Sequence, residues 1–420
     1  NTVNTRSVRR PSYISKDQTT RRHRPDYWLL IFSVLLLVIG LVVVYAISPG
    51  LSVQKNVSDN YFVTKQLVAI ALGIVTFIGA SMLPTQSWRK LQTPFIVLSV
   101  VASVAVLVFG ERVNGAYRWI QIGGLSFQAV ELVKFTLLIW LAGFLTDRIK
   151  NKELSDSRKT FRPLLILLAI IALVVANPKI QSDLGSTGVL IAMIAAMCFV
   201  ACLPLKRVVV IGLVVIAGTG LLVITSPYRR DRFQTFLQPQ RDCQNTGYQA
   251  CQALIAIGSG GLFGKGLAHS VQAYGYLPEA ANDSIFAIFS EKFGFVGVTL
   301  LLCLYAAFYA RLKAIMERAP DVFSRLLVVG VLAWLSTQAL INIGAMVGLL
   351  PLKGITLPFI SYGGTSIIFV TAAIGIVFNI SRYTTYGINS NLESEGGSNE
   401  SITDRRGDRR THHAYTSRRP

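Results

Sequence analysis

Apolar residues run through the chain in long blocks separated by polar segments, without the alternation that a half-buried strand would show. A helix that crosses the hydrocarbon core of a bilayer needs about 20 mostly apolar residues. The pattern therefore predicts an all-α integral membrane protein with about ten transmembrane helices. The stretches that reach or approach the required length lie at 27–48, 62–83, 93–110, 129–146, 163–177, 185–204, 207–225, 284–310, 326–350 and 364–381.

The polar segments divide the chain into three parts. We expect a basic tail at 1–26, a ten-span domain at 27–383 and a C-terminal tail at 384–420, whose Ser, Gly, Asn and charged residues are typical of disorder. The longest connection within the domain covers 226–283, between the seventh and eighth spans. It is predicted to form a large loop on one side of the membrane.

The composition excludes several classes of protein. Charged residues make up 15% of the chain, against roughly 25% in an ordinary soluble domain, and hydrophobic residues make up 52%. A water-soluble core cannot enclose apolar blocks of this length. The five Cys residues are too sparse for a secreted disulfide scaffold.

A net charge of +20 would suggest nucleic-acid binding in a soluble protein. Here most Lys and Arg residues outside the spans fall on the side that carries both ends of the chain, including 1–26, 147–162 and 382–420. Basic residues of short connections stay in the cytoplasm. We therefore expect both termini in the cytoplasm and the 226–283 loop outside. The basic tails would lie near anionic membrane lipids or dock a partner protein, and we expect no nucleic acid.

Two ionisable residues lie together inside a predicted span. Burying a charge in the membrane is costly, so such residues usually mark a function or a specific pair. Glu131 and Lys134 are three residues apart and share one face of a helix. Two interpretations stay open: a buried structural ion pair, or a polar cavity that Lys134 lines.

Asp183 stands, with Gln181 before it, at the mouth of the sixth predicted span. It either caps that helix through its side chain or faces a path for a substrate or an ion.

The segment 350–366, which includes Lys353 and Ser361, contains two prolines and three glycines at membrane depth. Broken backbone of this kind is tolerated only where protein or a wet cavity surrounds it.

The predicted outer loop carries a glycine-rich run at 258–266 and two cysteines, Cys243 and Cys251. The run lacks the leading Gly and the final Ser or Thr of a phosphate-binding Walker loop. It is predicted to pack backbone closely or to form a re-entrant turn. The compartment permits a disulfide between the two cysteines, and the sequence leaves open whether it forms.

Asp283 closes this loop, four residues after Glu279 and directly before the span at 284–310. A carboxylate at the edge of the apolar layer is a candidate general base. A helix N-cap or an ion pair is the alternative.

Three motifs carry a resemblance to the SEDS family (shape, elongation, division and sporulation), whose members are ten-span polymerases of bacterial cell-wall glycan. The motifs read NGAYRWIQIGG with FQAVELVK, then YLPEAANDSIFAIFSEKFGFVG, then NIGAMVGLLPLKGITLPFISYGGTS. The resemblance covers nearly all of 27–383. The form LPLKG, with Lys353, is similar to division-type members, whereas elongation-type members usually lack this Lys.

The resemblance implies a peptidoglycan glycosyltransferase. Such an enzyme joins the disaccharide units of lipid II into glycan strands at the outer membrane face, with inversion and release of undecaprenyl pyrophosphate, here in septal wall synthesis during division. The alternatives are a transporter that flips lipid II, a scaffold without chemistry and an elongation-type polymerase. A transporter would need no base at the outer face.

The resemblance identifies Asp283 as the residue that takes the proton from the attacking sugar hydroxyl, a weak nucleophile. Cations would stabilise the pyrophosphate that leaves, and a divalent ion such as Mg or Mn could share this task, although no cluster of ligands names a metal site. Trp119 and Tyr248 would stack on sugar or belong to an interfacial aromatic belt. The candidates for substrate-binding or supporting roles are Arg118, Trp119, Glu131, Lys134, Gln181, Asp183, Arg229, Arg232, Tyr248, Glu279, Lys353 and Ser361.

The resemblance also implies partners and a location. A class B penicillin-binding protein, which is a transpeptidase, would pack beside the spans and cross-link the glycan. Further division proteins would join it in the bacterial inner membrane at the division septum.

Overall fold

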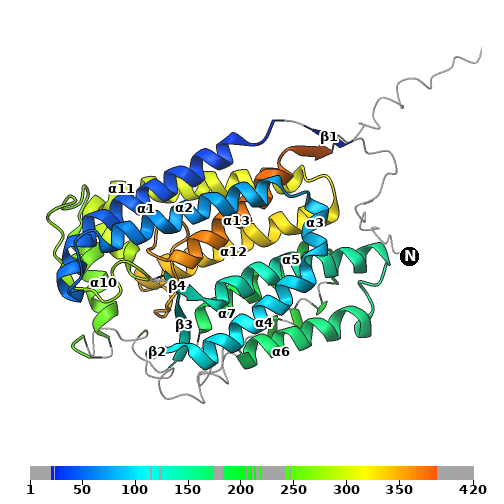
Figure 1. Ribbon diagram of the computed structural model, residues 1–420, viewed down its shortest axis with the longest axis horizontal. Coiled ribbons are helices and arrows are strands. Elements are labelled where there is room, and N and C mark those ends of the chain that lie inside the picture. Colours follow the sequence, from blue (N-terminus) through cyan, green and yellow to red (C-terminus); the bar gives the residue numbers. More distant parts are fainter. Residues whose placement is uncertain are drawn as a thin grey trace, which may run out of the picture. The chain divides into compact units, whose positions relative to one another are not determined.

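The structure, a computed structural model, describes residues 20–22, 24–113, 116–122, 125–174, 183–204, 206–207, 209–210, 212–213, 218, 236, 243–245 and 247–385. Most of this part of the chain is helical (Figure 1). Its helices are α1 (Tyr27–Lys55), α2 (Tyr61–Met82), α3 (Thr85–Lys90), α4 (Gln92–Phe109), α5 (Ala129–Lys150), α6 (Arg162–Val174), α7 (Leu184–Val200), α10 (Tyr248–Ser259), α11 (Ile285–Glu317), α12 (Val322–Met346) and α13 (Gly364–Ile380), with short π-helical turns η1 (Ser157–Phe161) and η3 (Gln272–Tyr276).

Six of these helices are long and apolar enough to cross a membrane, namely α1, α2, α4, α5, α11 and α12, and α7 and α13 are shorter apolar helices. Each predicted span coincides with one helix, except 207–225, most of which lies outside the described residues. The predicted all-α membrane fold is therefore confirmed. The total of ten spans stays a prediction.

The predicted connections hold more regular structure than the hydropathy pattern indicated. A three-stranded antiparallel sheet lies between α4 and α5, in the order β2 (Glu111–Val113), β3 (Ala116–Ile122) and β4 (Leu125–Gln128). The predicted outer loop at 226–283 contains α10 and η3.

Acidic side chains mark where several helices begin. Asp26 Oδ1 accepts from the N–H of Leu29 at 3.2 Å and so caps α1. Asp183 Oδ1 accepts from the N–H of Ser186 at 2.9 Å and caps α7. A side-chain oxygen at this position satisfies an N–H group that has no partner within the helix. The N-cap interpretation of Asp183 is confirmed.

The helices differ in how far they are enclosed. Most of the apolar windows of α5 and α12 is buried, whereas a much smaller share of those of α2, α4 and α11 is buried. Exposed apolar faces suit contact with lipid, while a helix enclosed by protein can carry polar side chains that find partners inside the fold. The enclosed helices α5 and α12 are the ones that position the candidate site.

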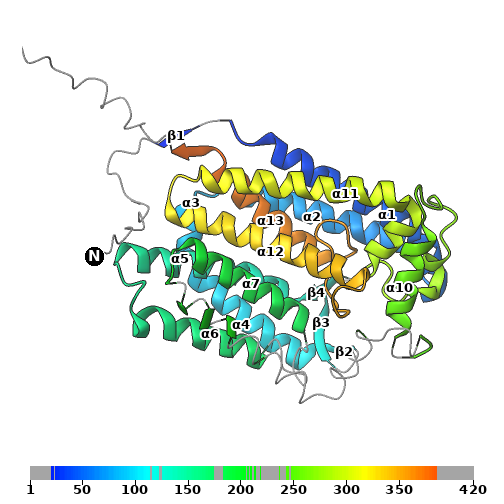
Figure 2. The ribbon, with the colours of Figure 1, turned by 180° about the vertical axis from the view of Figure 1, so that it is seen from behind.

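The two ends of the helical domain meet. The N–H of Asp26 donates to Ser381 Oγ at 3.0 Å, and strand β1 (Thr20–Arg22) pairs with β5 (Tyr383–Thr385). Figures 1 and 2 show these strands and α3 at one end of the bundle, and α10 with the β2–β4 sheet toward the other. Both ends of the domain thus lie at one end of the bundle; that both termini face the cytoplasm stays a prediction.

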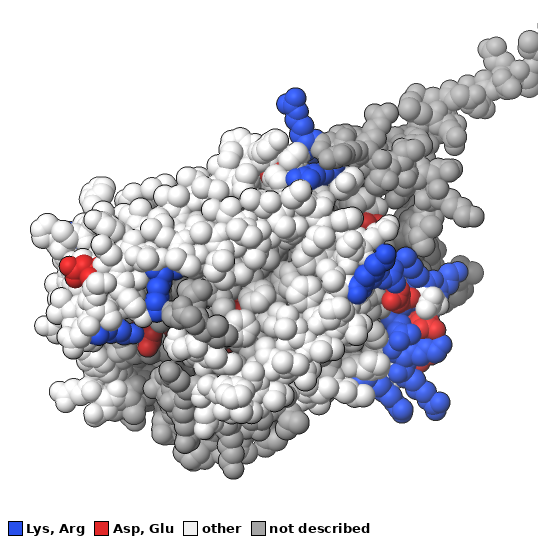
Figure 3. Space-filling view, viewed as in Figure 1, with Lys and Arg blue, Asp and Glu red and all other residues white. Residues whose placement is uncertain are grey.

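Exposed basic residues gather at the end of the bundle that carries β1 and β5. Figure 3 shows Lys and Arg gathered where α5 ends and α6 begins, while the face over the helices is almost free of charge. The exposed basic residues of this region include Lys150, Lys152, Arg158, Lys159 and Arg162. Apolar faces bounded by basic ends are typical of a membrane protein.

Helix α11 is broken at Gly294, where φ is 64° and ψ is −166°. L-residues with a side chain rarely adopt this conformation, so the break requires glycine. A break interrupts the hydrogen-bond ladder of the helix, and backbone groups without partners are expensive in a membrane.

The glycine-rich run at 258–266 supplies the missing partners. Two N–H groups of α11 donate to carbonyls of the run, and two N–H groups of the run donate to carbonyls of α11, all at 2.9–3.0 Å. A Cβ at Gly260 or Gly264 would overlap the backbone of α11, so the run must be glycine-rich to come this close. Close backbone packing, as predicted, is confirmed. The donor–acceptor pairs are Phe295 to Gly261, Val296 to Leu262, Lys265 to Glu291 and Gly266 to Lys292.

Candidate active site

Asp283 lies at the end of the turn 278–284, directly before α11, and is partly buried. Ser284, and not Asp283, occupies the N-cap position of α11, and it makes no side-chain cap. The interpretation of Asp283 as a helix N-cap is therefore wrong. The alternatives of an ion pair and of a general base both stay open.

The backbone around Asp283 is fixed from outside the turn. The carbonyls of three successive residues, 281–283, each accept one hydrogen bond from elsewhere in the chain. The donors are the N–H of Tyr362 at 2.9 Å, Oγ of Ser361 at 2.7 Å and Nδ2 of Asn342 at 2.7 Å. These bonds fix the position of the backbone from which the Asp283 side chain extends.

The segment 351–363, predicted to be broken backbone at membrane depth, lies against this turn. Its residues from Ile355 to Ser361 are buried, and their backbone groups find partners in protein. Ser361 Oγ accepts from the N–H of Leu357 at 2.7 Å, and the hydroxyl of Tyr305 donates to the carbonyl of Pro358 at 2.6 Å. Irregular backbone at membrane depth is thus surrounded by protein, as expected.

Lys134 lies inside the bundle with an exposed fraction of 0%. Its Nζ donates to Glu131 Oε1 at 2.7 Å and to Gln338 Oε1 at 2.9 Å, and it lies 5.3 Å from the ring centroid of Trp334. The buried ion pair is confirmed. Lys134 is fully enclosed by protein groups, and its role at the site stays a prediction.

Gln338 joins this ion pair to the broken segment. Its Oε1 accepts from both Lys134 and Trp334 Nε1, while its Nε2 donates to the carbonyl and the hydroxyl of Thr356 at 3.0 and 3.1 Å. One turn further along α12, Asn342 Nδ2 donates to the carbonyls of Asp283 and Ile355, both at 2.7 Å. Helix α12 thereby connects the buried cation to the turn that carries Asp283.

Three buried acceptor oxygens around this network have no hydrogen-bond partner among the described residues. An unpaired buried polar atom costs free energy, so each of these oxygens needs a partner that the described residues do not supply. They are Glu131 Oε2, Asp183 Oδ2 and Asn342 Oδ1.

Lys353 lies beside the start of α7. Its Cβ is 3.2 Å from the position that a Cβ on Gly185 would occupy, and its side chain is partly buried. Gly185 follows Asp183 by two residues, so Lys353, a candidate cation, is close to the capped end of this helix.

Glu279 shapes the turn before Asp283. Its backbone carbonyl accepts from the N–H groups of Asn282 and Ser284 at 3.0 and 3.2 Å, and its exposed carboxylate accepts from Asn282 Nδ2 at 2.6 Å. These contacts hold the turn before Asp283 in shape.

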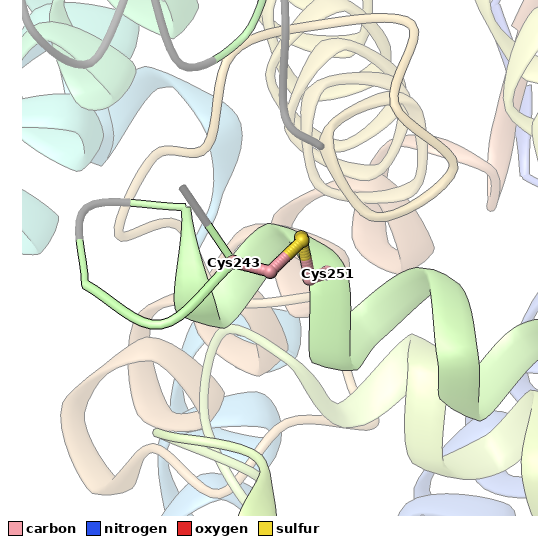
Figure 4. Close-up of a disulfide and its surroundings, with 2 residues drawn as sticks. All are labelled: Cys243 and Cys251. Carbon is pink, nitrogen blue, oxygen red and sulfur yellow. A yellow bond between two sulfur atoms is a disulfide. The ribbon is translucent and has the colours of Figure 1, made fainter. Parts of the chain in front are cut away.

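Helix α10 reaches the same turn from the predicted outer loop. Tyr248 is its first residue, and Gln249 Nε2 donates to Ser284 Oγ at 3.1 Å. A disulfide joins Cys243 to Cys251, with the two Cα atoms 5.7 Å apart (Figure 4). The disulfide that the sequence left open is formed.

The other predicted site residues lie apart from this network or outside the described part. Trp119 sits on β3 opposite Gln128 of β4, whose N–H donates to Thr365 Oγ1 of α13 at 3.3 Å. Arg118 also belongs to β3, and its side chain lies outside the described residues. The predictions for Gln181, Arg229 and Arg232 fall outside the described residues altogether.

Within the described part of the chain, no three His, Cys, Asp or Glu residues come close enough to hold a metal ion. A divalent cation therefore stays an untested expectation.

Three side-chain amides of this network were not among the predicted site residues: Gln249, Gln338 and Asn342. The last two carried a signal, because two amides one turn apart interrupt an apolar span. Amides in a span are tolerated when they bond to other protein groups, which is how both are used.

Comparison with known proteins identifies the family. A family model described as "Cell cycle protein", which groups FtsW, RodA and SpoVE, matches residues 27–386. The chain belongs to the SEDS family. Stage V sporulation protein E of Bacillus subtilis is 36% identical to this SEDS protein over 371 residues, which cover 88% of this chain and 100% of that protein. The probable peptidoglycan glycosyltransferase FtsW of Saccharophagus degradans is 37% identical over 362 residues, which cover 85% of this chain and 92% of that protein.

Solved structures show the same SEDS fold. A chain from a study of the structural coordination of polymerization and crosslinking by a peptidoglycan synthase complex matches with a TM-score of 0.68 and 29% identity, over 85% of this chain and 98% of that one. The rod shape determining protein RodA of Thermus thermophilus matches with a TM-score of 0.62 and 28% identity, over 85% and 97%.

Proposed function

We propose that this SEDS protein is a peptidoglycan glycosyltransferase that polymerises lipid II. Several relatives carry the name peptidoglycan glycosyltransferase, and the first of these matches over 92% of its length. The match therefore spans nearly the whole of that relative.

Asp283 is the general base in this proposal. Its carboxylate takes the proton of the 4-hydroxyl of a lipid-linked GlcNAc as that oxygen attacks the anomeric carbon of the growing chain's MurNAc. The bond from that carbon to undecaprenyl pyrophosphate breaks, and a β-1,4 linkage forms with inversion. One displacement needs one base and no covalent intermediate.

The observation that carries the proposal is the way the Asp283 backbone is held. A base works only within hydrogen-bond reach of the proton that it removes, and misplacement is costly. The partly buried Asp283 stands on a turn whose carbonyls at 281–283 are each bonded to the broken segment or to α12. Such fixation suits a carboxylate that must meet a substrate hydroxyl in one geometry.

Cations complete the proposed site, because the leaving pyrophosphate gains negative charge in the transition state. Lys353 is placed to contribute, since it lies beside the start of α7 and is partly exposed. Lys134 acts indirectly, because it is fully enclosed by its partners. Arg229 and Arg232 stay candidates from the sequence, and a divalent ion such as Mg or Mn stays a further one.

Replacing the base tests the proposal. The purified full chain, reconstituted in proteoliposomes with its transpeptidase partner, is given labelled lipid II, and the glycan products are resolved on a gel. We expect Asp283→Asn to lower the rate by at least about 100-fold, the usual contribution of a general base. Asp59→Asn, the same change at an exposed residue, is the matched control. Normal elongation by Asp283→Asn would overturn the proposal and leave lipid II transport as the alternative.

The proposed location follows from charge and family. The protein crosses the bacterial inner membrane several times, with both termini in the cytoplasm and the turn 278–284 at the outer face. Lys353 favours a division-type enzyme at the septum over an elongation-type one. A polymerase of this type would work beside a class B penicillin-binding protein and other division proteins. A solved relative comes from a study of a peptidoglycan synthase complex that coordinates polymerization and crosslinking.

A further inference from the structure

Helix α10 contacts the candidate site through one side-chain bond. Gln249 Nε2 donates to Ser284 Oγ at 3.1 Å, and Ser284 Oγ in turn donates to the carbonyl of Pro278 at 2.9 Å. Ser284 adjoins Asp283 in sequence. Pro278 and Ser284 are the two ends of the turn that carries the proposed base. Gln249 is therefore bonded directly to one end, Ser284, and through the Ser284 hydroxyl to the other.

The first turn of α10 carries a cross-link. The helix has only 12 residues, and its N-cap residue, Gly247, provides no side-chain cap. Helices of this length are marginal on their own. The disulfide joins Cys251, on the first turn, to Cys243, which precedes the helix, and Gln249 lies within the loop that it closes (Figure 4). A cross-link of this kind removes many of the open conformations that the segment could otherwise adopt.

We propose that Gln249 is a positioning residue for Asp283 and that the Cys243–Cys251 disulfide holds Gln249 in place. This inference rests on the proposed function and on the outer location of α10, where a disulfide is stable. Reduction would release the first turn of α10, break the contact with Ser284 and let the turn 278–284 move. The enzyme would still bind lipid II, but its base would spend less time in the productive position.

The primary experiment needs no mutation. The wild-type full chain in proteoliposomes is treated with tris(2-carboxyethyl)phosphine, and the state of the cysteines is followed by maleimide gel shift. Two electrons from the phosphine and two protons convert the disulfide to two thiols, and the phosphine becomes its oxide with oxygen from water. We expect kcat for lipid II polymerisation to fall about three- to tenfold, as for the loss of one hydrogen bond, with KM nearly unchanged and recovery on reoxidation.

A cysteine variant shows whether this disulfide is the target. The double variant Cys243→Ser/Cys251→Ser should have the kcat of the reduced wild type before any treatment. The phosphine should not change its kcat further, because its remaining cysteines Cys198, Cys202 and Cys303 are unpaired. A full response of this double variant to the phosphine would overturn the inference.

A coupling experiment shows whether the disulfide acts through Gln249. Gln249→Ala should lower kcat to the same degree, and reduction should lower it no further, because linked residues are not additive. Gln54→Ala, at an exposed residue on α1, is the matched control and should respond to the phosphine like the wild type. If Gln249→Ala lost a further several-fold on reduction, the disulfide would act elsewhere and the role of Gln249 would be refuted.

The inference and the proposed function fail in different ways. If the wild type makes glycan, Asp283→Asn does not, and confirmed reduction leaves kcat unchanged, the inference alone falls. If the oxidised wild type makes no glycan while a known SEDS polymerase does so in the same assay, both fall.

Discussion

The side-chain amide of Asn342 lies 2.7 Å from the backbone oxygen of Asp283 and bonds it to the middle of the bundle. The same Nδ2 donates to the carbonyl of Ile355, and the side chain is only 1% exposed. A single amide on α12 thus joins two segments, at Asp283 and at Ile355, that lie 72 residues apart in the sequence.

We expect Asn342→Asp to lower kcat for polymerisation by about 10- to 100-fold, with a smaller effect on KM. The substitution keeps the shape of the side chain but replaces the donor with an oxygen that repels both carbonyls. Asn379→Asp is the matched control, because Asn379 Nδ2 donates to the carbonyl of Leu83 near the other end of the bundle. The control should lose stability but keep its kcat. Equal kcat losses in both variants would show that Asn342 has no special relation to Asp283.

The ion pair of Glu131 and Lys134 predicts strong non-additivity. Lys134→Met leaves a buried carboxylate without its cation and should lower the free energy of unfolding by about 3–5 kcal/mol. Adding Glu131→Gln removes the stranded charge and should restore much of that loss. Thermal unfolding in detergent, followed by tryptophan fluorescence, measures both. A double variant less stable than Lys134→Met would contradict the pairing.

The break in α11 predicts that Gly294 tolerates no side chain. Gly294→Ala places a Cβ at a positive φ and against the backbone of Leu262 and Gly264, so it should destabilise by more than about 1 kcal/mol. Gly258→Ala, in α10, is the control, because no atom lies within 4 Å of the added Cβ, and it should be neutral or stabilising. Melting temperatures of the two variants check this directly, and similar values would refute the close approach.

The predicted cytoplasmic connection between α5 and α6 should respond to acid. Hydrogen bonds from Lys159 and Arg148 hold the pKa of Glu153 below its ordinary value. A carboxyl whose pKa is lowered by folding stabilises the fold above its unfolded pKa of about 4.3, and this contribution is lost as pH falls through the lowered value. Glu153→Gln should therefore flatten the acid side of the stability curve, measured as melting temperature against pH, and leave neutral polymerisation unchanged. An identical acid response in both proteins would count against the pairing.

Local patterns predicted much of the fold because they act through neighbours in sequence. The apolar blocks gave the spans, and Glu131 and Lys134 could be paired because three residues along a helix bring them onto one face. Asp183 could be read as a cap for the same reason. The sheet β2–β4 was not predicted, because its strands are short, lie between glycines and directly adjoin two long apolar spans.

The network around Asp283 could be predicted only in part. Asp283 stood out because it directly precedes an apolar span. Asn342 and Gln338 were visible as amides in a span, but their partners lie in segments that only the tertiary fold brings near. The partner of Gln249 is 35 residues away and follows from the packing of α10 on α11, which no local pattern specifies.

The glycine-rich run that bonds to α11 at the Gly294 break has a consequence for biosynthesis. The ribosome makes residues 258–266 before it makes 294, so the groups that complete the ladder of α11 already exist when that helix emerges. Without the run, the backbone N–H and C=O groups at the break in α11 would face hydrocarbon without hydrogen-bond partners. We therefore expect residues 258–317 to fold as one unit, in which the glycine-rich run and α11 complete each other's hydrogen bonds.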